Sequence, residues 1–180
     1  NVKNATAAIA VSNFIGISSN ILKKSLKNFK GVERRFNKIF TYNGADIYDD
    51  YAHHPTEIRQ VINGVNNSFK EKKIICIFQP HRVSRLNDLK NEFCLSFKKA
   101  SYVILCPVYK AGENLKLNFN YNKFAEQIAK KSKVQVFFVK NQNELAKFLK
   151  QFLSHENVVI GMGAGTISNW IKELPVLMKK

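Results

Sequence analysis

Short apolar runs alternate with amphipathic segments over most of this chain. The runs KKIICIFQP, YVILCPV, VQVFFV and NVVIGMG are continuous in apolar residues, which is typical of strands buried on both faces of a sheet. The segments between them have helical spacing and begin near Pro55, Leu86, Asn122, Asn143 and Thr166. This alternation predicts an α/β fold, a Rossmann-like, doubly wound and mostly parallel sheet flanked by helices.

A different pattern precedes the alternating region. Small and apolar residues from Thr6 to Phe14 predict a buried helix, and Ser19 is placed to cap a second helix that ends at Gly31. The dipeptide Asn43-Gly44 between two β-prone runs then predicts a hairpin. We therefore expect a short helical segment over residues 1–40, a boundary near residue 40, and the α/β domain over residues 41–180.

Composition restricts the class of protein. The 180 residues are 45% hydrophobic, which is enough for one well-buried core. We expect neither a membrane span nor a signal peptide, because no run of about 18 apolar residues occurs and the first residues lack a basic leader. A cytoplasmic protein is expected. Three cysteines in apolar surroundings predict reduced core thiols, Cys76, Cys94 and Cys106.

The formal net charge of +16 raises the possibility of a nucleic-acid-binding module. Most of the positive charge is lysine spread along the chain, and no reading helix or aromatic platform is visible, so a solvated basic surface is favoured. Only five of the 29 basic residues are arginine, and four of these lie in GVERRF and QPHRVSR. Arginine in a lysine-rich chain indicates positions that need a planar, bidentate donor.

Polar residues follow four of the predicted strands at the point where each strand ends. They lie in the segments 50–54, 79–85, 109–113 and 163–166. Ligands bind outside the carboxyl ends of the strands in sheets of this kind. The topology therefore predicts that carboxylates, imidazoles, two arginines and a glycine-rich turn gather at one edge and form a site.

Each polar feature also has a plain structural alternative. Asp49 and Asp50 are an acidic pair that can cap the next helix. His53, His54 and His81 suggest a metal site, but adjacent histidines point in different directions and no carboxylate has ligand spacing, so a metal is disfavoured. A histidine near an acid and two arginines fits a carboxylate-bearing substrate with an amine better.

The other features have alternatives of the same kind. Arg82 and Arg85 are three residues apart at a predicted helix start, which permits either a carboxylate clamp or a surface pair. The glycines of GMGAGT can receive an anion at a helix start or simply allow close packing of strand and helix. Tyr109 and Glu113 in VYKAGE are either ligand contacts or part of a turn.

Taken in order, the segments NVKNATAAIAV, GVERRF, DDYAHHPTEI, FQPHRVSR, PVYKAGE and GMGAGT resemble the Mur ligases, over nearly the whole chain. The resemblance implies three domains, of which residues 1–40 resemble the end of the central ATPase domain and residues 41–180 the amino-acid-binding domain. It also implies ATP and Mg²⁺, with the metal ligands and the phosphate loop outside these residues. The activity implied is the joining of L-alanine to UDP-N-acetylmuramate in peptidoglycan synthesis, and these 180 residues alone are expected to be inactive.

The resemblance also implies a role for individual residues. Asn1 and Asn4 would lie at the adenine side of the nucleotide site, Arg35 would reach its phosphates, and Asp50 would hold the ribose or nucleotide. Catalysis and L-alanine binding would use His53, Arg82 and Arg85, with Tyr51 shaping the pocket.

Four positions depart from the family pattern, namely Val83, Leu86, Lys110 and Thr166, and Thr166 stands where an aspartate often follows GAG. A ligase of the same family that recycles murein tripeptide is the nearest alternative. Its second-strand loop resembles E-P-R-S-N-T more than QPHRVSR, so the loop favours the L-alanine activity.

Overall fold

The computed structural model describes residues 2–114 and 120–179, and the chain forms two compact units. The helical unit is Asn1–Glu33 and the sheet unit is Arg34–Lys180. The division lies before the boundary predicted near residue 40, because the first strand of the sheet already begins at Asn37.

The helical unit contains α1 (Val2–Phe14) and α2 (Ser19–Asn28). The prediction of a buried first helix is wrong, because no residue of α1 is buried. The prediction that Ser19 caps α2 is also wrong. Ser18 holds the cap position without a side-chain hydrogen bond, and α2 ends at Asn28, before Gly31.

The sheet unit is built on six strands in the order β1-β2-β6-β3-β4-β5. β1 (Asn37–Tyr42) is antiparallel to β2 (Ala45–Asp50), and all other neighbours are parallel. The remaining strands are β3 (Lys73–Phe78), β4 (Tyr102–Leu105), β5 (Gln135–Phe138) and β6 (Asn157–Met162). The predicted mostly parallel α/β sheet is confirmed.

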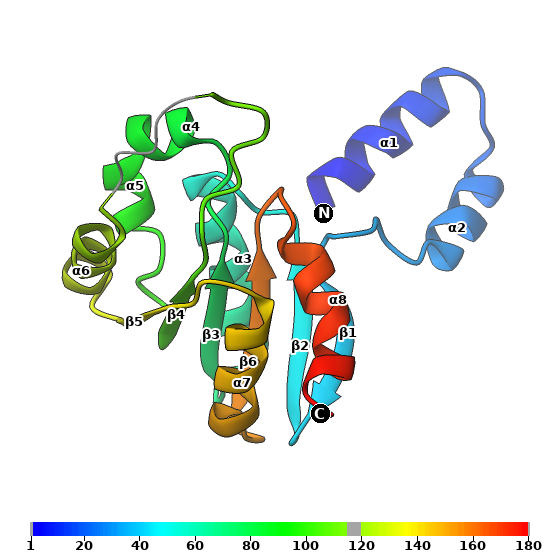
Figure 1. Cartoon of the computed structure of the whole chain (residues 1–180). Helices are drawn as coiled ribbons and strands as arrows, with labels where there is room; N and C mark the ends of the chain where they lie inside the picture. The colour runs from blue at the N-terminus through cyan, green and yellow to red at the C-terminus, as the bar shows by residue number, and fades with distance from the viewer. Residues whose placement is uncertain (1, 115–119, 180) are drawn as a thin grey trace. The chain divides into compact units, whose positions relative to one another are not determined.

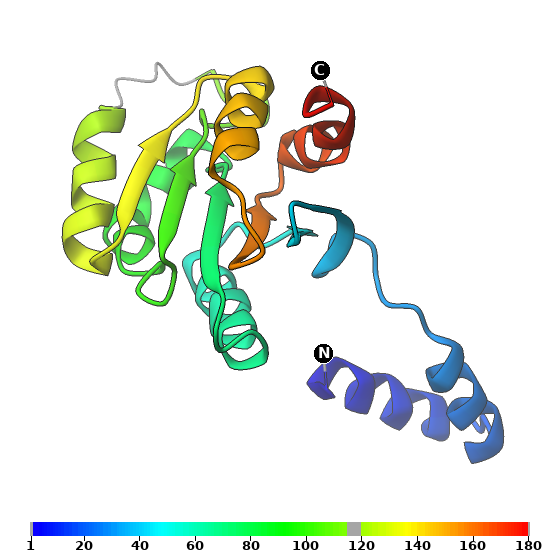
Figure 2. The same cartoon turned by 90° about the horizontal axis from the view of Figure 1, so that it is seen from below.

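Helices cover both faces of the sheet (Figures 1 and 2). One face packs against α3 (Pro55–Ser68), α4 (Val83–Asp88), α5 (Lys90–Cys94) and α6 (Tyr121–Ser132). The other face packs against α7 (Gln142–Phe152) and α8 (Ile167–Leu177). Alternate residues of β3 enter the two cores, since Cys76 and Phe78 pack on one face while Ile75 and Ile77 pack on the other.

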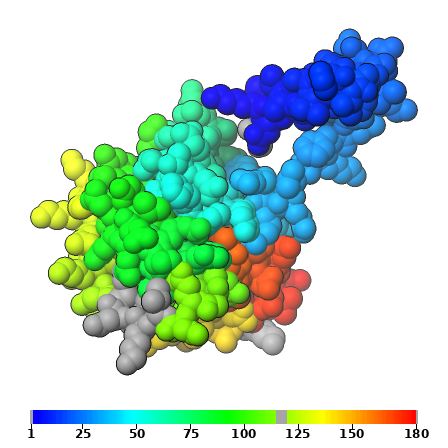
Figure 3. Space-filling view, turned by 90° about the horizontal axis from the view of Figure 1, so that it is seen from above, coloured from blue at the N-terminus to red at the C-terminus, as the bar shows by residue number. Residues whose placement is uncertain are grey.

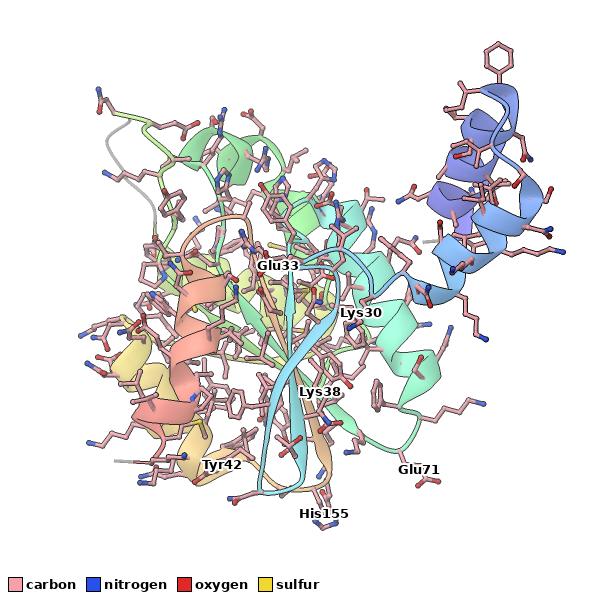
Figure 4. All side chains as sticks on the ribbon, turned by 90° about the vertical axis from the view of Figure 1, so that its right-hand side faces the viewer. Lys30, Glu33, Lys38, Tyr42, Glu71 and His155 are labelled. Carbon is pink, nitrogen blue, oxygen red and sulfur yellow. The ribbon has the colours of Figure 1, made fainter. Side chains whose placement is uncertain are left out.

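The predicted hairpin at Asn43-Gly44 is confirmed. Both residues have positive φ, 48° and 78°, as a tight turn between β1 and β2 requires. A methyl group on Gly44 would also lie 2.7 Å from Cβ of His155. Figure 4 shows Tyr42 and His155 at the same end of the sheet, which is the end where β2 begins.

A helix of the sheet unit also differs from its prediction. The single helix expected from Leu86 to Ala100 is two short helices that meet at Leu89, and the second stops at Cys94. The Phe97 N–H donates to Oγ of Ser132 at 3.1 Å rather than to a helical carbonyl, which draws the chain out of the helix. The three cysteines are buried and free, as predicted.

Candidate functional site

Backbone hydrogen bonds join the loops at the carboxyl edge of the sheet. Gly163, after β6, donates its N–H to the Asp50 carbonyl at the end of β2. Gln79, after β3, donates to the Met162 carbonyl, and Tyr109, after β4, donates to the Pro80 carbonyl. Figure 3 looks down on this edge, where the segments after β2 (cyan), β3 and β4 (green) and β6 (orange) lie side by side.

Four aromatic rings form a row across this edge. Tyr51 and His53 follow β2, and their ring centroids are 5.1 Å apart. The His53 ring is 5.8 Å from His81, which follows β3, and the His81 ring stacks at 5.5 Å on Tyr109, which follows β4. The row connects three loops that are distant in the sequence, and four such rings offer a partly apolar wall with imidazole nitrogens.

Local contacts fix the orientation of the His53 ring. Nδ1 lies 2.9 Å from the Tyr51 carbonyl and 3.4 Å from Oε2 of Glu57. Because both neighbours are acceptors, Nδ1 carries the proton in the neutral ring, and Nε2 is left as the unprotonated nitrogen. The geometry therefore prepares His53 to accept a hydrogen bond at Nε2.

Glu57 also organises the start of α3. Its Oε2 accepts the N–H groups of His53 and His54, while Nδ1 of His54 accepts from Thr56, which completes a capping box. Burial acts to raise the pKa of Glu57, but the two N–H groups and the neighbouring cations outweigh it and lower that pKa. His54 is thus a helix cap rather than a partner of His53 in a metal site.

Arg85 reaches back to His81. Its Nη1 lies 3.2 Å from Nδ1 of His81 and 3.4 Å from the His81 carbonyl oxygen. Burial lowers the pKa of the His81 imidazole, and the guanidinium groups of Arg85 and Arg82 lower it further. These surroundings favour the neutral form of the His81 ring.

Arg82 has an exposed side chain at the start of α4. Its φ of 69° lies in the left-handed region, and its N–H donates to the Tyr109 carbonyl at 2.8 Å. The backbone is thus held while the guanidinium stays free of the core, which suits a side chain that meets a ligand.

Glu113 holds the start of α4 from the loop after β4. It accepts the N–H groups of Val83 and Ser84 and the Ser84 hydroxyl. The Ser84 hydroxyl lowers the pKa of Glu113 first, and the two N–H groups add to this effect. The structural alternative for Glu113 is supported, since both carboxylate oxygens are used inside the protein. Three positions that depart from the family pattern lie near this contact. Val83 and Leu86 are buried, and Lys110 is exposed.

The glycine-rich turn after β6 is shaped by packing. A methyl group on Gly163 would lie 2.8 Å from the Gln79 carbonyl oxygen, and one on Gly165 would lie 2.6 Å from Oε1 of Gln79. That Oε1 atom accepts the Ile167 N–H at 3.0 Å, and Nε2 of Gln79 donates to Thr166. Thr166 itself makes no cap bond, so the amide of Gln79 caps α8 and takes a donor that an anion would otherwise use.

Asp50 braces the segment before β1. The side chain is buried, with Oδ1 accepting the Ala52 N–H and Oδ2 accepting the Phe36 N–H at 2.8 and 2.9 Å. Burial raises the pKa of Asp50 above its usual range, although these two N–H groups oppose the effect. Neighbouring Asp49 is also buried and accepts the Ser168 hydroxyl at 2.6 Å.

The other residues that the resemblance assigns to the nucleotide are Arg35, Asn4 and Asn1. Arg35 is exposed, and its N–H donates to the side chain of Asn37. Asn4 lies in α1 of the helical unit, and Asn1 lies outside the described residues. Over residues 2–114 and 120–179, no group of three His, Cys, Asp or Glu side chains is arranged to hold a metal ion.

Comparison with known proteins decides the family. Residues 34–165, most of the chain, match the family described as "Mur ligase, glutamate ligase domain". The chain belongs to the Mur ligase family. The matched region begins at the first residue of the sheet unit, and it extends into the glycine-rich turn after β6.

Individual Mur ligases give the same result. The chain is 62% identical over 178 residues to UDP-N-acetylmuramate–L-alanine ligase of Pelagibacter ubique, covering 99% of this chain and 38% of the relative. A solved UDP-N-acetylmuramate–alanine ligase from Thermotoga maritima has a TM-score of 0.79 and 29% identity, covering 99% of this chain and 37% of that one. A murein peptide ligase from Psychrobacter arcticus (TM-score 0.71, 20% identity, 98% of this chain, 36% of that one) shares the fold.

The chain thus spans just over a third of the length of the curated Mur ligases it matches. A nucleic-acid-binding module is not favoured by these matches. Among the described residues, none of the helices combines the length and hydropathy needed to cross a lipid bilayer.

Sequence reasoning missed some residues of this edge. Arg34 rather than Arg35 enters the edge, since its Nη2 donates to the Gly163 carbonyl at 2.6 Å and its Cζ lies 4.7 Å from the Tyr51 ring centroid. The sequence showed the pair of arginines, and the resemblance assigned a role to Arg35 and none to Arg34. The capping role of Glu57 had a signal, because it stands three residues after the cap residue His54.

Proposed function

We propose that this chain is the carboxyl-terminal part of an ATP-dependent UDP-N-acetylmuramate–L-alanine ligase and supplies the amino-acid half of its site. The observation that carries the proposal is the meeting of His53, His81 and Arg85 at one edge of the sheet. The 62% identity to a ligase of that name supports the choice of substrate.

The chemistry explains why such an edge is needed. A carboxylate is a poor electrophile, so the muramyl carboxylate is first converted with ATP to an acyl phosphate, whose phosphate can leave. The L-alanine nitrogen then forms the amide bond, and ADP and phosphate are released. The enzyme must hold the amine in line with the acyl carbon, give it a place to lose its proton, and exclude water.

In the proposal the two arginines and the ring row share these tasks. Arg82 and Arg85 bind the L-alanine carboxylate, which requires the planar fork of arginine rather than a lysine. In the neutral ring the contacts of Nδ1 make Nε2 of His53 the acceptor, and this atom accepts a hydrogen bond from the amine and steers it. Tyr51 and the stacked pair His81 and Tyr109 wall the small pocket.

Other residues of this chain are proposed to bind ATP. Exposed Arg35 meets the phosphates of ATP, and Asn1 and Asn4 of the helical unit lie by the adenine. Direct contact of Asp50 with the ribose stays a prediction. Its two oxygens already hold the N–H groups of Phe36 and Ala52, so Asp50 also fixes the segment that carries Arg35.

We assign the helical unit to the end of the central ATPase domain. We propose that Mg²⁺ binds together with ATP and is held by residues outside these 180. We also propose that the reaction takes place in the cytoplasm, where ATP is available. The 180 residues contain no glycine-rich loop with the lysine of a phosphate cradle, so the isolated chain should not turn over.

The test is amide formation by the full-length protein with ATP and UDP-N-acetylmuramate. L-Alanine and the tripeptide L-alanyl-D-glutamyl-diaminopimelate are offered separately, and products are identified by mass. We expect ligation of L-alanine only. Ligation of the tripeptide would select the recycling activity instead, and ligation of neither would refute the proposal.

A further inference from the structure

Arg34, the first residue of the sheet unit, contacts two loops of the site edge. Its Nη2 donates to the Gly163 carbonyl at 2.6 Å, and its guanidinium lies over the Tyr51 ring at 4.7 Å. Nε lies 3.7 Å from Oδ2 of Asp49, which is itself buried at the end of β2. One side chain therefore touches the end of β2, the segment after β2 and the turn after β6.

The charge pair inside this contact is incompletely hydrogen-bonded. Nε of Arg34 and Oδ1 of Asp49 are both buried without a hydrogen-bond partner among the described residues. Leaving buried polar atoms without a hydrogen bond costs free energy. If Arg34 served only to neutralise Asp49, we would expect its guanidinium to donate hydrogen bonds to the Asp49 carboxylate. Neutralisation alone therefore does not explain this geometry.

The backbone around Arg34 is held in an unusual shape. Arg34 and Phe36 have φ of 57° and 54°, both in the left-handed region that non-glycine residues avoid. Arg34 accepts the Tyr51 N–H at 2.8 Å, and Phe36 donates to Asp50 while its ring stacks on Tyr48 at 4.2 Å. Arg35, between the two, keeps an exposed side chain.

We infer that Arg34 is a positioning residue whose guanidinium fixes the segment 34–36 against the loops at Tyr51 and Gly163. In this way it sets the location of Arg35 and of Tyr51 for the ligation reaction. The inference concerns geometry first, and its consequence for turnover rests on the proposed function.

The competing role is purely structural, in which Arg34 serves as the counter-charge of Asp49. The two roles separate in a double-mutant design with Arg34→Met, Asp49→Asn and the double variant. Arg34→Met leaves a buried, uncompensated carboxylate, which Asp49→Asn then neutralises. If charge balance is the whole role, the double variant regains both stability and geometry.

Two readouts on the 180-residue chain need no activity, namely the thermal midpoint and amide hydrogen exchange of Tyr51 and Phe36. For the double variant we expect a midpoint near that of the unsubstituted chain but exchange of both amides at least about tenfold faster. Unchanged exchange with a restored midpoint would overturn the inference. Arg59→Met, which removes an arginine that donates to Thr56 of its own helix, is the matched control and should change neither.

Kinetics of the full-length protein complete the test. The double variant should lower kcat with ATP about ten- to a hundredfold, as a small misplacement near the reacting groups does, and raise KM for L-alanine. Kinetics equal to the unsubstituted enzyme would overturn the inference. If the unsubstituted enzyme does not ligate L-alanine, the proposed function fails while the exchange data still decide the role of Arg34. If Arg34→Met does not fold, Asp49→Asn and the double variant carry the comparison.

Discussion

Replacing Gly163 with alanine should destabilise the sheet unit strongly. Gly163 has φ of 152°, a conformation that costs a residue with a side chain about 1–3 kcal/mol. The added methyl would lie 2.8 Å from the Gln79 carbonyl oxygen and 3.1 Å from Cγ2 of Ile167. The carbonyl belongs to the backbone at the end of β3 and cannot swing away, so overpacking adds about 1–3 kcal/mol.

The two contributions together predict a loss of about 2–6 kcal/mol in the free energy of unfolding. For a unit of this size that corresponds to a fall of about 4–24 °C in the thermal midpoint. Gly64→Ala is the matched control, because Gly64 lies inside α3 and an added methyl meets no atom within 4 Å. Alanine is the better helix former there, so this variant should gain about 0.5–1 kcal/mol.

Urea and thermal unfolding followed by circular dichroism measure both variants against the unsubstituted chain. Opposite shifts are expected from the same chemical change. If Gly163→Ala unfolds within about 0.5 kcal/mol of the unsubstituted chain, the close approach of the β6 turn to Gln79 is wrong. If Gly64→Ala also destabilises, the comparison of the two backbone environments fails.

Three further predictions follow from the site edge and the core. Glu57→Gln should lower stability at pH 7 by about 0.5–1 kcal/mol in urea unfolding. The lowered pKa means that Glu57 stabilises fully above its unfolded value of 4.5 and progressively less as the pH falls through its folded pKa. The difference should therefore vanish in strong acid, and a difference that persists there would exclude the charge as its cause. In the full-length enzyme, Arg85→Lys should lower kcat/KM for L-alanine at least about tenfold while Arg59→Lys changes it little, and equal effects would remove the clamp assignment. Burial raises the pKa of the three thiols, so a disulfide reagent at pH 8 should label Cys76, Cys94 and Cys106 only after denaturation.

The sheet and its site edge were largely predictable because their signals are local or topological. Continuous apolar runs identify parallel strands, and the loops after such strands must share an edge, so the sequence predicts that His53, His81 and Arg85 come together, as they do in the structure. The Asn43-Gly44 turn was equally predictable, because few dipeptides accept two positive φ angles.

The features that the sequence did not predict, or left open, depend on contacts between distant segments. The break of the predicted helix after Cys94 depends on Ser132, far along the chain, which takes the Phe97 N–H. The helix cap at Thr166 comes from Gln79, and Glu113 is used by the start of α4. No periodicity or propensity encodes these pairings. The exposure of α1 was not predicted, because its small apolar residues indicate a buried helix. Such residues do not indicate which part of a protein buries the helix.

The most direct test of the proposed amino-acid half-site uses the NMR signals of the histidine rings. The full-length protein, labelled with ¹³C-histidine, is titrated with L-alanine in the presence of UDP-N-acetylmuramate and a non-hydrolysable ATP analogue. His53 and His81 lie at the carboxyl edge, whereas His155 lies beside Gly44 at the other end of the sheet. We predict that the first two signals shift with L-alanine while that of His155 does not. Ligation of L-alanine by an enzyme in which neither His53 nor His81 responds would contradict the placement of the amino acid at this edge.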